Sequence, residues 1–138
     1  MILFLKNTND GTRIYKSNFK YTNLSNSLNY NIEKLCNKFL FSYNGYKKAL
    51  KLKLNLKSLQ PLYLNKNLIL IPIKNIKDYH NLFINFKAIT SIIKIDNSNT
   101  KLFFNTGETL IINKNINFFY DKEKEITKIE NYLNSLKL

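Results

Sequence analysis

The sequence predicts an α+β fold: a single domain over residues 1–138, built mainly from an antiparallel β-sheet, with a central helix near residues 31–45 and a C-terminal helix. Three observations support this prediction. Apolar residues recur at helical spacing in two stretches, and short apolar runs separated by polar links occupy much of the remainder. A chain of 138 residues that is 44% hydrophobic is also sufficient for one core.

One or two strands are expected at the N-terminus. Residues 1–5 form a short apolar run, and residues 13–21 alternate loosely between apolar and polar side chains. Residues 9–11, with the sequence Asn-Asp-Gly, have the composition of a turn between them.

The central helix is predicted from apolar residues that recur every three or four positions. Asn31 is the expected N-cap, and Gly45 stands where a helix stops or bends. The residues expected on its buried face are Ile32, Leu35, Cys36, Phe39, Leu40 and Tyr43.

From residue 50 to residue 57, leucine alternates with lysine or asparagine. This strict period of two predicts a strand with four leucines on one face and three lysines on the other. Leucine is not a strong strand former, so a helix that extends to about Leu52 is the alternative. After Pro61, residues 67–73 are a candidate buried strand, and Pro72 indicates a sheet edge or a strand terminus.

The last third contains four apolar runs, at residues 82–86, 89–95, 100–104 and 109–112, which predict strands. Asn105, Thr106 and Gly107 have the chemistry of a hairpin turn. Asn113 is the expected cap of a closing helix whose apolar face consists of Ile116, Phe119, Tyr120, Ile126, Ile129, Leu133 and Leu136.

The positive charge is concentrated in one part of the chain. There are 22 Lys and Arg residues against 9 Asp and Glu, which gives a formal charge of +13. A codon bias toward A and T could by itself enrich the chain in lysine. Codon bias does not readily explain the placement, however: residues 34–77 hold ten lysines and no acid, whereas residues 121–138 hold four of each. A long region of one sign attracts polyanions.

Catalysis and metal binding find little support in the sequence. Cys36 is the only cysteine and His80 the only histidine, which excludes an intramolecular disulfide and a zinc cluster. The three glycines are far apart, so there is no glycine-rich phosphate loop. We therefore expect no enzyme, no cofactor and no metal.

A cytoplasmic location is also expected. The longest charge-free apolar stretch, residues 67–73, is far shorter than the roughly 20 residues of a membrane helix. Residues 1–5 do not form a signal peptide, and we expect no membrane partner.

Nucleic-acid binding is the better-supported chemistry. A row of lysines directly follows Tyr43 and Asn44, so charges that neutralise phosphates lie beside groups that reach base edges. Tyr43 itself is expected in the core. Asn44 and Asn55 can donate to minor-groove acceptors, and Arg13, the only arginine, suits a narrow minor groove. The candidate DNA-binding residues are Arg13, Ser42, Asn44, Tyr46, Lys47, Lys48, Lys51 and Lys53.

The order of several short motifs resembles the competence transcription factor family, ComK. Residues 61–73 are similar to its proline-containing stretch and strand end, residues 83–89 to its Trp-Ile-Asn...Ile segment, and residues 101–107 to its hairpin. The resemblance covers roughly residues 32–120. Its most specific part is a cysteine and an aromatic residue before a Ser-Tyr-x-Gly element and two basic residues, here Cys36, Phe39, Ser42, Tyr43, Gly45, Lys47, Lys48 and then Ala49.

The resemblance implies a regulator that binds A·T-rich promoter DNA, largely through the minor groove, and activates DNA-uptake genes. The partners it implies are double-stranded DNA, further copies of the chain in a dimer or higher assembly, and a proteolytic adaptor. By this resemblance the chain, which stops near Leu138, is expected to be shorter than family members that carry an extra C-terminal segment for activation and adaptor-directed degradation. By the same resemblance, Lys47 and Lys48 form the basic helix end, and Tyr46 stands where arginine is common.

Two other hypotheses remain open at this point. Residues 92–112 are also compatible with the paired strands of a LytTR-type β domain that binds DNA. Alternatively, the protein is an interaction module in which the lysines form only a solvated face.

Overall fold

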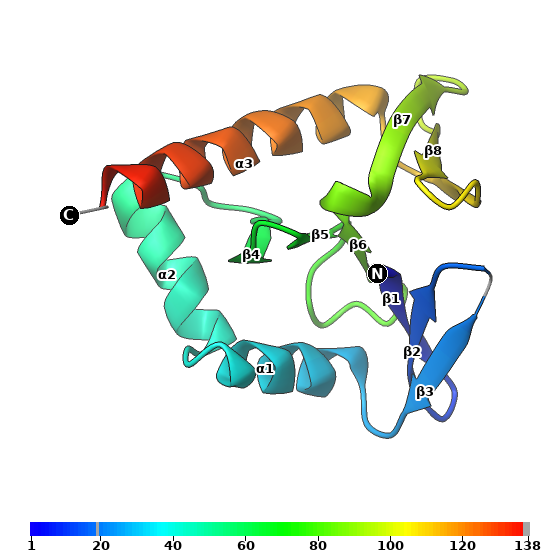
Figure 1. Ribbon diagram of the computed structural model, residues 1–138, viewed down its shortest axis with the longest axis horizontal. Helices are drawn as coiled ribbons and strands as arrows, with labels where there is room; N and C mark the ends of the chain where they lie inside the picture. Colours follow the sequence, from blue (N-terminus) through cyan, green and yellow to red (C-terminus); the bar gives the residue numbers. More distant parts are fainter. Residues whose placement is uncertain (19, 137–138) are drawn as a thin grey trace.

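Two antiparallel β-sheets form the frame of the fold in the computed structural model, which describes residues 1–18 and 20–136 (Figure 1). The larger sheet has the strand order β3-β2-β1-β6-β5-β4, and the smaller has the order β7-β8-β9. The larger sheet consists of β1 (Ile2–Thr8), β2 (Gly11–Lys16), β3 (Tyr21–Leu24), β4 (Leu62–Asn65), β5 (Leu68–Pro72) and β6 (Leu82–Asn85). The smaller sheet consists of β7 (Ile89–Lys94), β8 (Thr100–Phe104) and β9 (Thr109–Ile112), and the short 3-10 helix η1 (Phe86–Ala88) leads into it.

Three helices lie around these sheets: α1 (Leu28–Lys38), α2 (Tyr43–Leu54) and α3 (Ile116–Ser135). Figure 1 shows the larger sheet between α1 at the bottom and α3 at the top. The α+β class, the antiparallel pairing and the C-terminal helix confirm the fold predicted from the sequence.

The two faces of the larger sheet are buried by different elements, because side chains alternate along each strand. One face, which we call the α1–α2 face, packs Leu5 and Phe83 against Ile32 and Tyr43 of the helices. The opposite face, the α3 face, packs Ile69 and Ile71 of β5 against Ile126 of α3, and further along it contacts the smaller sheet.

The helix expected near residues 31–45 is present as two helices with a turn between them. Leu40 takes the left-handed conformation (φ 69°) with its side chain 93% exposed, and Phe41 N–H donates to Cys36 O over 3.3 Å. Together with a Leu40 N–H to Asn37 O bond of 3.0 Å, this is a Schellman cap at the end of α1. Such caps usually contain glycine, so the sequence carried no signal for the break.

The helix boundaries also differ from the expected caps. Ser27, not Asn31, caps α1, and Asn31 lies inside the helix, where its amide donates to the carbonyls of the preceding loop. Ser42 caps α2 by accepting from Gly45 N–H at 3.0 Å. Gly45 therefore begins a helix instead of ending one, and a Cβ at this position would lie 2.8 Å from the Ser42 hydroxyl oxygen.

The strand predicted over residues 50–57 is wrong, because α2 continues to Leu54. Leu50 and Leu54 are one helical turn apart and pack inward, whereas Leu52 is 83% exposed. Asn55 then takes the left-handed conformation (φ 59°) that asparagine tolerates, and it ends the helix.

Strands β5 to β9 follow the predicted apolar runs closely, whereas β4 has no counterpart among the predicted strands, and the N-terminus forms three strands where one or two were expected. Pro72 ends β5, as expected for a strand terminus, although β5 lies inside the sheet and not at its edge. Gly107 has φ 90° in the β8–β9 turn, which confirms the predicted hairpin. Asn115, not Asn113, caps α3 by accepting from Asn117 N–H at 2.8 Å.

Candidate nucleic-acid interface

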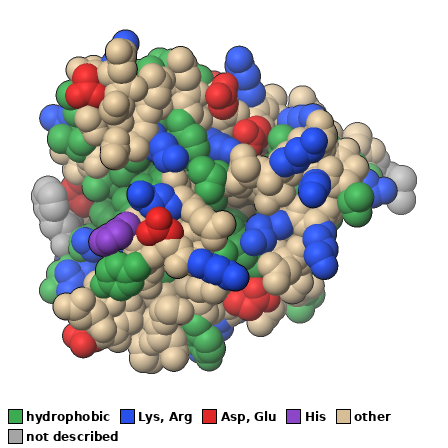
Figure 2. All heavy atoms as spheres, turned by 180° about the vertical axis from the view of Figure 1, so that it is seen from behind, with side chains coloured by type: hydrophobic (Ala, Val, Ile, Leu, Met, Phe, Trp, Pro, Cys, Tyr) green, Lys and Arg blue, Asp and Glu red, His purple; other side chains and the backbone are tan. Residues whose placement is uncertain are grey.

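One face of α2 carries four of the residues predicted to contact DNA. Asn44, Lys47, Lys48 and Lys51 stand at positions i, i+3, i+4 and i+7, so they share one side of the helix. We call these four residues the α2 basic face. Tyr43 is only 5% exposed and Leu50 is buried, so the helix is anchored in the core while this side remains accessible. Figure 2 shows several lysine side chains gathered on the side of the molecule where α2 lies.

The charges of the α2 basic face are not neutralised by acids. Within residues 1–18 and 20–136, the one ion pair joins Lys122 to Glu125 in α3, with 3.0 Å between Nζ and Oε1. The carboxylate of Glu33 contacts the start of α2, where it accepts from Tyr43 N–H at 3.2 and 3.3 Å. Such a carboxylate is stabilised by the positive end of the helix dipole. Lys47 Nζ lies 4.4 Å from the centre of the Tyr43 ring, and none of the lysines one and two turns further along the helix forms an ion pair with a described acid.

Two α3 lysines instead donate hydrogen bonds to backbone carbonyls of the segment at the end of α2. Lys128 Nζ donates to Leu54 O over 2.6 Å, and Lys122 Nζ donates to Ser58 O over 3.0 Å. Lys122 is 4% exposed. These bonds hold the C-terminal end of α2 and the loop after it against α3.

A second group of lysines lies beside the α2 basic face. Lys47, Lys57 and Lys74 line one cavity of about 230 Å³, and none of its lining residues is acidic. Gln60 fixes the loop that carries Lys57, because its Nε2 donates to Lys47 O (3.0 Å) and to Leu56 O (2.7 Å). Lys74 belongs to the acid-free stretch of the sequence, but only the fold brings it next to Lys47.

The other predicted residues of this helix lie elsewhere on it. Ser42 is the N-cap, and Lys53 and Tyr46 line an apolar cavity between α2 and α3, on the opposite flank from Lys51. The Tyr46 hydroxyl donates to Pro61 O (2.7 Å) and accepts from Tyr63 N–H (2.9 Å). Burial raises the pKa of Tyr46 to about 12.

Replacing Tyr46 with phenylalanine is expected to destabilise the protein without weakening DNA binding. The substitution leaves Tyr63 N–H and Pro61 O without this partner, which costs about 1–3 kcal/mol. Urea unfolding measures the loss. Tyr132→Phe is the matched control, since the Tyr132 hydroxyl makes no hydrogen bond within the described part of the chain. An unchanged midpoint for Tyr46→Phe would contradict this role.

Arg13 lies far from the α2 basic face. It pairs with Lys6 across β1 and β2, and both residues project from the α3 face of the sheet, whereas α2 packs on the α1–α2 face. The guanidinium stacks over the Tyr21 ring, with 4.2 Å from Cζ to the ring centroid, and its Nε donates to Asn23 Oδ1 over 3.1 Å. These bonds, and one to the Tyr15 hydroxyl, belong to a different surface.

The single cysteine lies in the core, and the single histidine lies on the surface. Cys36 is buried against α2, and burial raises the pKa of its thiol to about 12, so it is protonated at neutral pH. His80 is exposed in the β5–β6 loop. Among the residues described, no three His, Cys, Asp or Glu side chains come together as metal ligands. The helices in this part of the chain are too short or too polar to span a bilayer.

The fold and this surface together define a small α+β protein that presents a cationic helix face. The chain belongs to the ComK family, because the model described as ComK protein matches residues 4–135, nearly the whole chain. ComK is a family of competence transcription factors and not of enzymes. The match also includes the N-terminal strands and α3, which lie outside the motifs recognised in the sequence. Neither the curated proteins nor the solved structures contain a match.

Proposed function

We propose that this chain binds A·T-rich promoter DNA as a duplex and regulates competence genes in the cytoplasm. The observation that supports this most directly is the α2 basic face, four residues on one side of a helix with no acid paired to them. The family match to competence transcription factors supports the same assignment.

The chemistry divides between phosphates and bases. In the proposal Lys47, Lys48 and Lys51 neutralise phosphates, and the lysines of the neighbouring cavity, Lys57 and Lys74, extend the contact along the backbone. Asn44 stands on the same helix face and donates to acceptors on the floor of the minor groove. Because those acceptors distinguish A·T from G·C pairs and little more, groove width contributes to the choice of site.

Further copies of the chain belong to the proposal as well. β3 and β4 are edge strands of the larger sheet, and exposed edges favour pairing with another chain. A homodimer or higher assembly would double the number of phosphate contacts on a symmetric site. The proteolytic adaptor stays a prediction of the family resemblance.

Fluorescence anisotropy with A·T-rich and G·C-rich duplexes of equal length tests the proposal. With five lysines on phosphates, the logarithm of the association constant should fall with the logarithm of salt concentration with a slope of about −4 to −5. A minor-groove ligand such as netropsin should displace the protein. Binding without salt dependence would overturn the proposal and favour an interaction module, and preference for G·C-rich DNA would favour the LytTR-type alternative.

A further inference from the structure

The α3 face of the N-terminal strands carries a column of aromatic rings. Phe4 of β1 stacks on Tyr15 of β2, with ring centroids 4.4 Å apart and planes inclined by 17°. Tyr15 lies 6.0 Å from Tyr21 of β3, and on the other side Phe4 lies 6.2 Å from Phe104 of the smaller sheet. The register explains the column, because Phe4 pairs with Tyr15 and Tyr15 pairs with Tyr21 across adjacent strands.

Two cations accompany these rings. Arg13 covers Tyr21 at 4.2 Å, and Lys6 Nζ lies 5.7 Å from the centre of the Tyr15 ring. The hydrogen bond to the Tyr15 hydroxyl raises the pKa of Arg13, and Asn23 holds its Nε, so the guanidinium plane is fixed on the ring. An arginine held in this way presents a flat cationic surface on which a further ring can stack.

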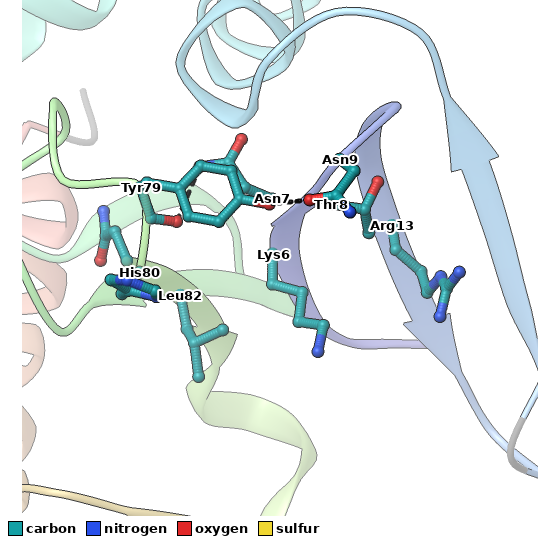
Figure 3. A pocket seen from close by; sticks show the side chains of 9 residues that line it. Lys6, Asn7, Thr8, Asn9, Arg13, Tyr79, His80 and Leu82 are labelled. Atoms are coloured by element: carbon teal, nitrogen blue, oxygen red, sulfur yellow. Dashed lines mark hydrogen bonds between the residues drawn. The ribbon is translucent and has the colours of Figure 1, made fainter.

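A large cavity begins beside these cations. Its volume is about 520 Å³, and it lies between the β1–β2 hairpin and the β5–β6 loop. Figure 3 shows Lys6 and Arg13 projecting to the same side from neighbouring strands, with Tyr79 and His80 on the loop across from them. No Asp or Glu lines this cavity.

Aromatic rings beside cations form a surface that suits single-stranded nucleic acid. Aromatic rings on a sheet bind bases whose faces are free, and the faces of duplex bases are already stacked on one another. A single strand offers free base faces together with a phosphate at every step, which Lys6 and Arg13 can neutralise. Tyr21 marks the accessible end of the column, because it is on an edge strand and its side chain is 51% exposed.

We propose that the surface formed by Lys6, Arg13, Tyr15 and Tyr21 is a second nucleic-acid site, specific for single-stranded polynucleotide. It lies on the opposite face of the larger sheet from α1 and α2 and does not depend on the function proposed for α2. Bases stack on the exposed Tyr21 and Arg13, and the backbone runs past Lys6 into the cavity. Binding there is tolerant of base sequence, since every base has a π face.

Anisotropy with fluorescein-labelled dT and mixed-sequence oligonucleotides of about 15 nucleotides tests this site. Tyr21→Ala should weaken single-strand binding about tenfold, and Tyr21→Ala with Arg13→Gln about 100-fold, while duplex binding stays the same. Tyr21→Phe keeps the ring and should bind like the unaltered protein. The matched control is Tyr30→Ala, a tyrosine of α1 that is equally exposed (52%).

The same series separates the two sites. A variant in which Lys47, Lys48 and Lys51 are replaced by glutamine should keep its single-strand affinity and lose only duplex affinity. Absence of single-strand binding by the unaltered protein would overturn the inference. So would an equal loss in Tyr30→Ala, or loss of single-strand binding in the α2 variant, since one surface would then serve both ligands.

Discussion

Replacing Lys47, Lys48 and Lys51 together by glutamine is expected to reduce affinity for A·T-rich duplex DNA by roughly 500-fold at about 0.1 M salt. Each phosphate contact contributes about 0.9 to the salt slope, which corresponds to roughly an eightfold change in affinity between about 1 M and 0.1 M salt. The eightfold losses from three contacts multiply to roughly 500-fold, and the salt slope becomes shallower by about 2.7. A salt titration of the variant beside the unaltered protein measures both quantities.

A second triple variant provides the charge-matched control. Lys87, Lys94 and Lys124 are exposed and lie on η1, β7 and α3, so replacing them with glutamine removes the same charge from other surfaces. We expect a small change in affinity there. If both triple variants lose affinity equally, the affinity for DNA depends only on the net charge of the protein, and the α2 basic face has no special role.

Lys53 tests the geometry within one helix. It was predicted as a DNA contact, yet it lies on the flank of α2 that faces the apolar cavity beside α3. Lys53→Gln should therefore change duplex affinity less than Lys51→Gln, although the two residues are two positions apart. The reverse order would place the DNA on the α3 side of the helix.

Gly11→Ala is expected to destabilise the fold by about 3 kcal/mol or more. Gly11 begins β2 with φ 148°, a conformation that L side chains rarely adopt, and a Cβ there would collide with the carbonyl oxygen of Leu24 on β3. That oxygen belongs to the backbone of β3, and it cannot move without shifting the β2–β3 pairing, in which Leu24 is the partner of Thr12. Urea unfolding monitored by circular dichroism measures the change.

Gly107→Ala is the control that separates the steric collision at Gly11 from the cost of placing alanine at a positive φ. Gly107 also has a positive φ, 90°, but a Cβ there would meet nothing within 4 Å. Only the conformational term remains, so a loss of about 1 kcal/mol is expected. Similar losses for both variants would show that contact with Leu24 contributes nothing.

The sequence predicts β1, β2 and β5 to β9 because their signals are local, but it does not predict β3 or β4. Each apolar run is bounded by polar residues, and the turn at Gly107 has its own chemistry. The region from residue 28 to residue 55 could not be predicted in the same way. Its helix break depends on Leu40 in a conformation that normally calls for glycine, and alternating leucines satisfy a strand pattern while Leu50 and Leu54 also satisfy a helical one.

The candidate interface was predictable only in its sequence-local part. Lys47, Lys48 and Lys51 stand close together in the chain, so a helix places them on one side whatever the rest of the fold does. Whether Lys53 joins them depends on which flank of α2 meets α3. Lys74 comes close to Lys47 only because of the path of the loop after β5. Arg13 lies apart from the α2 basic face because its side chain projects from the other face of the sheet.

The bonds from Lys128 to Leu54 O and from Lys122 to Ser58 O hold α3 against α2, the helix that is proposed to contact DNA. The two ammonium groups hold the last turn of α2 and the loop that carries Lys57, so the orientation of the α2 basic face depends on the position of α3. If α2 binds DNA as proposed, a change that loosens the second half of α3 is expected to weaken duplex binding as well, because the two would be linked equilibria. A protein that binds α3 would then change the orientation of the α2 basic face without contacting it.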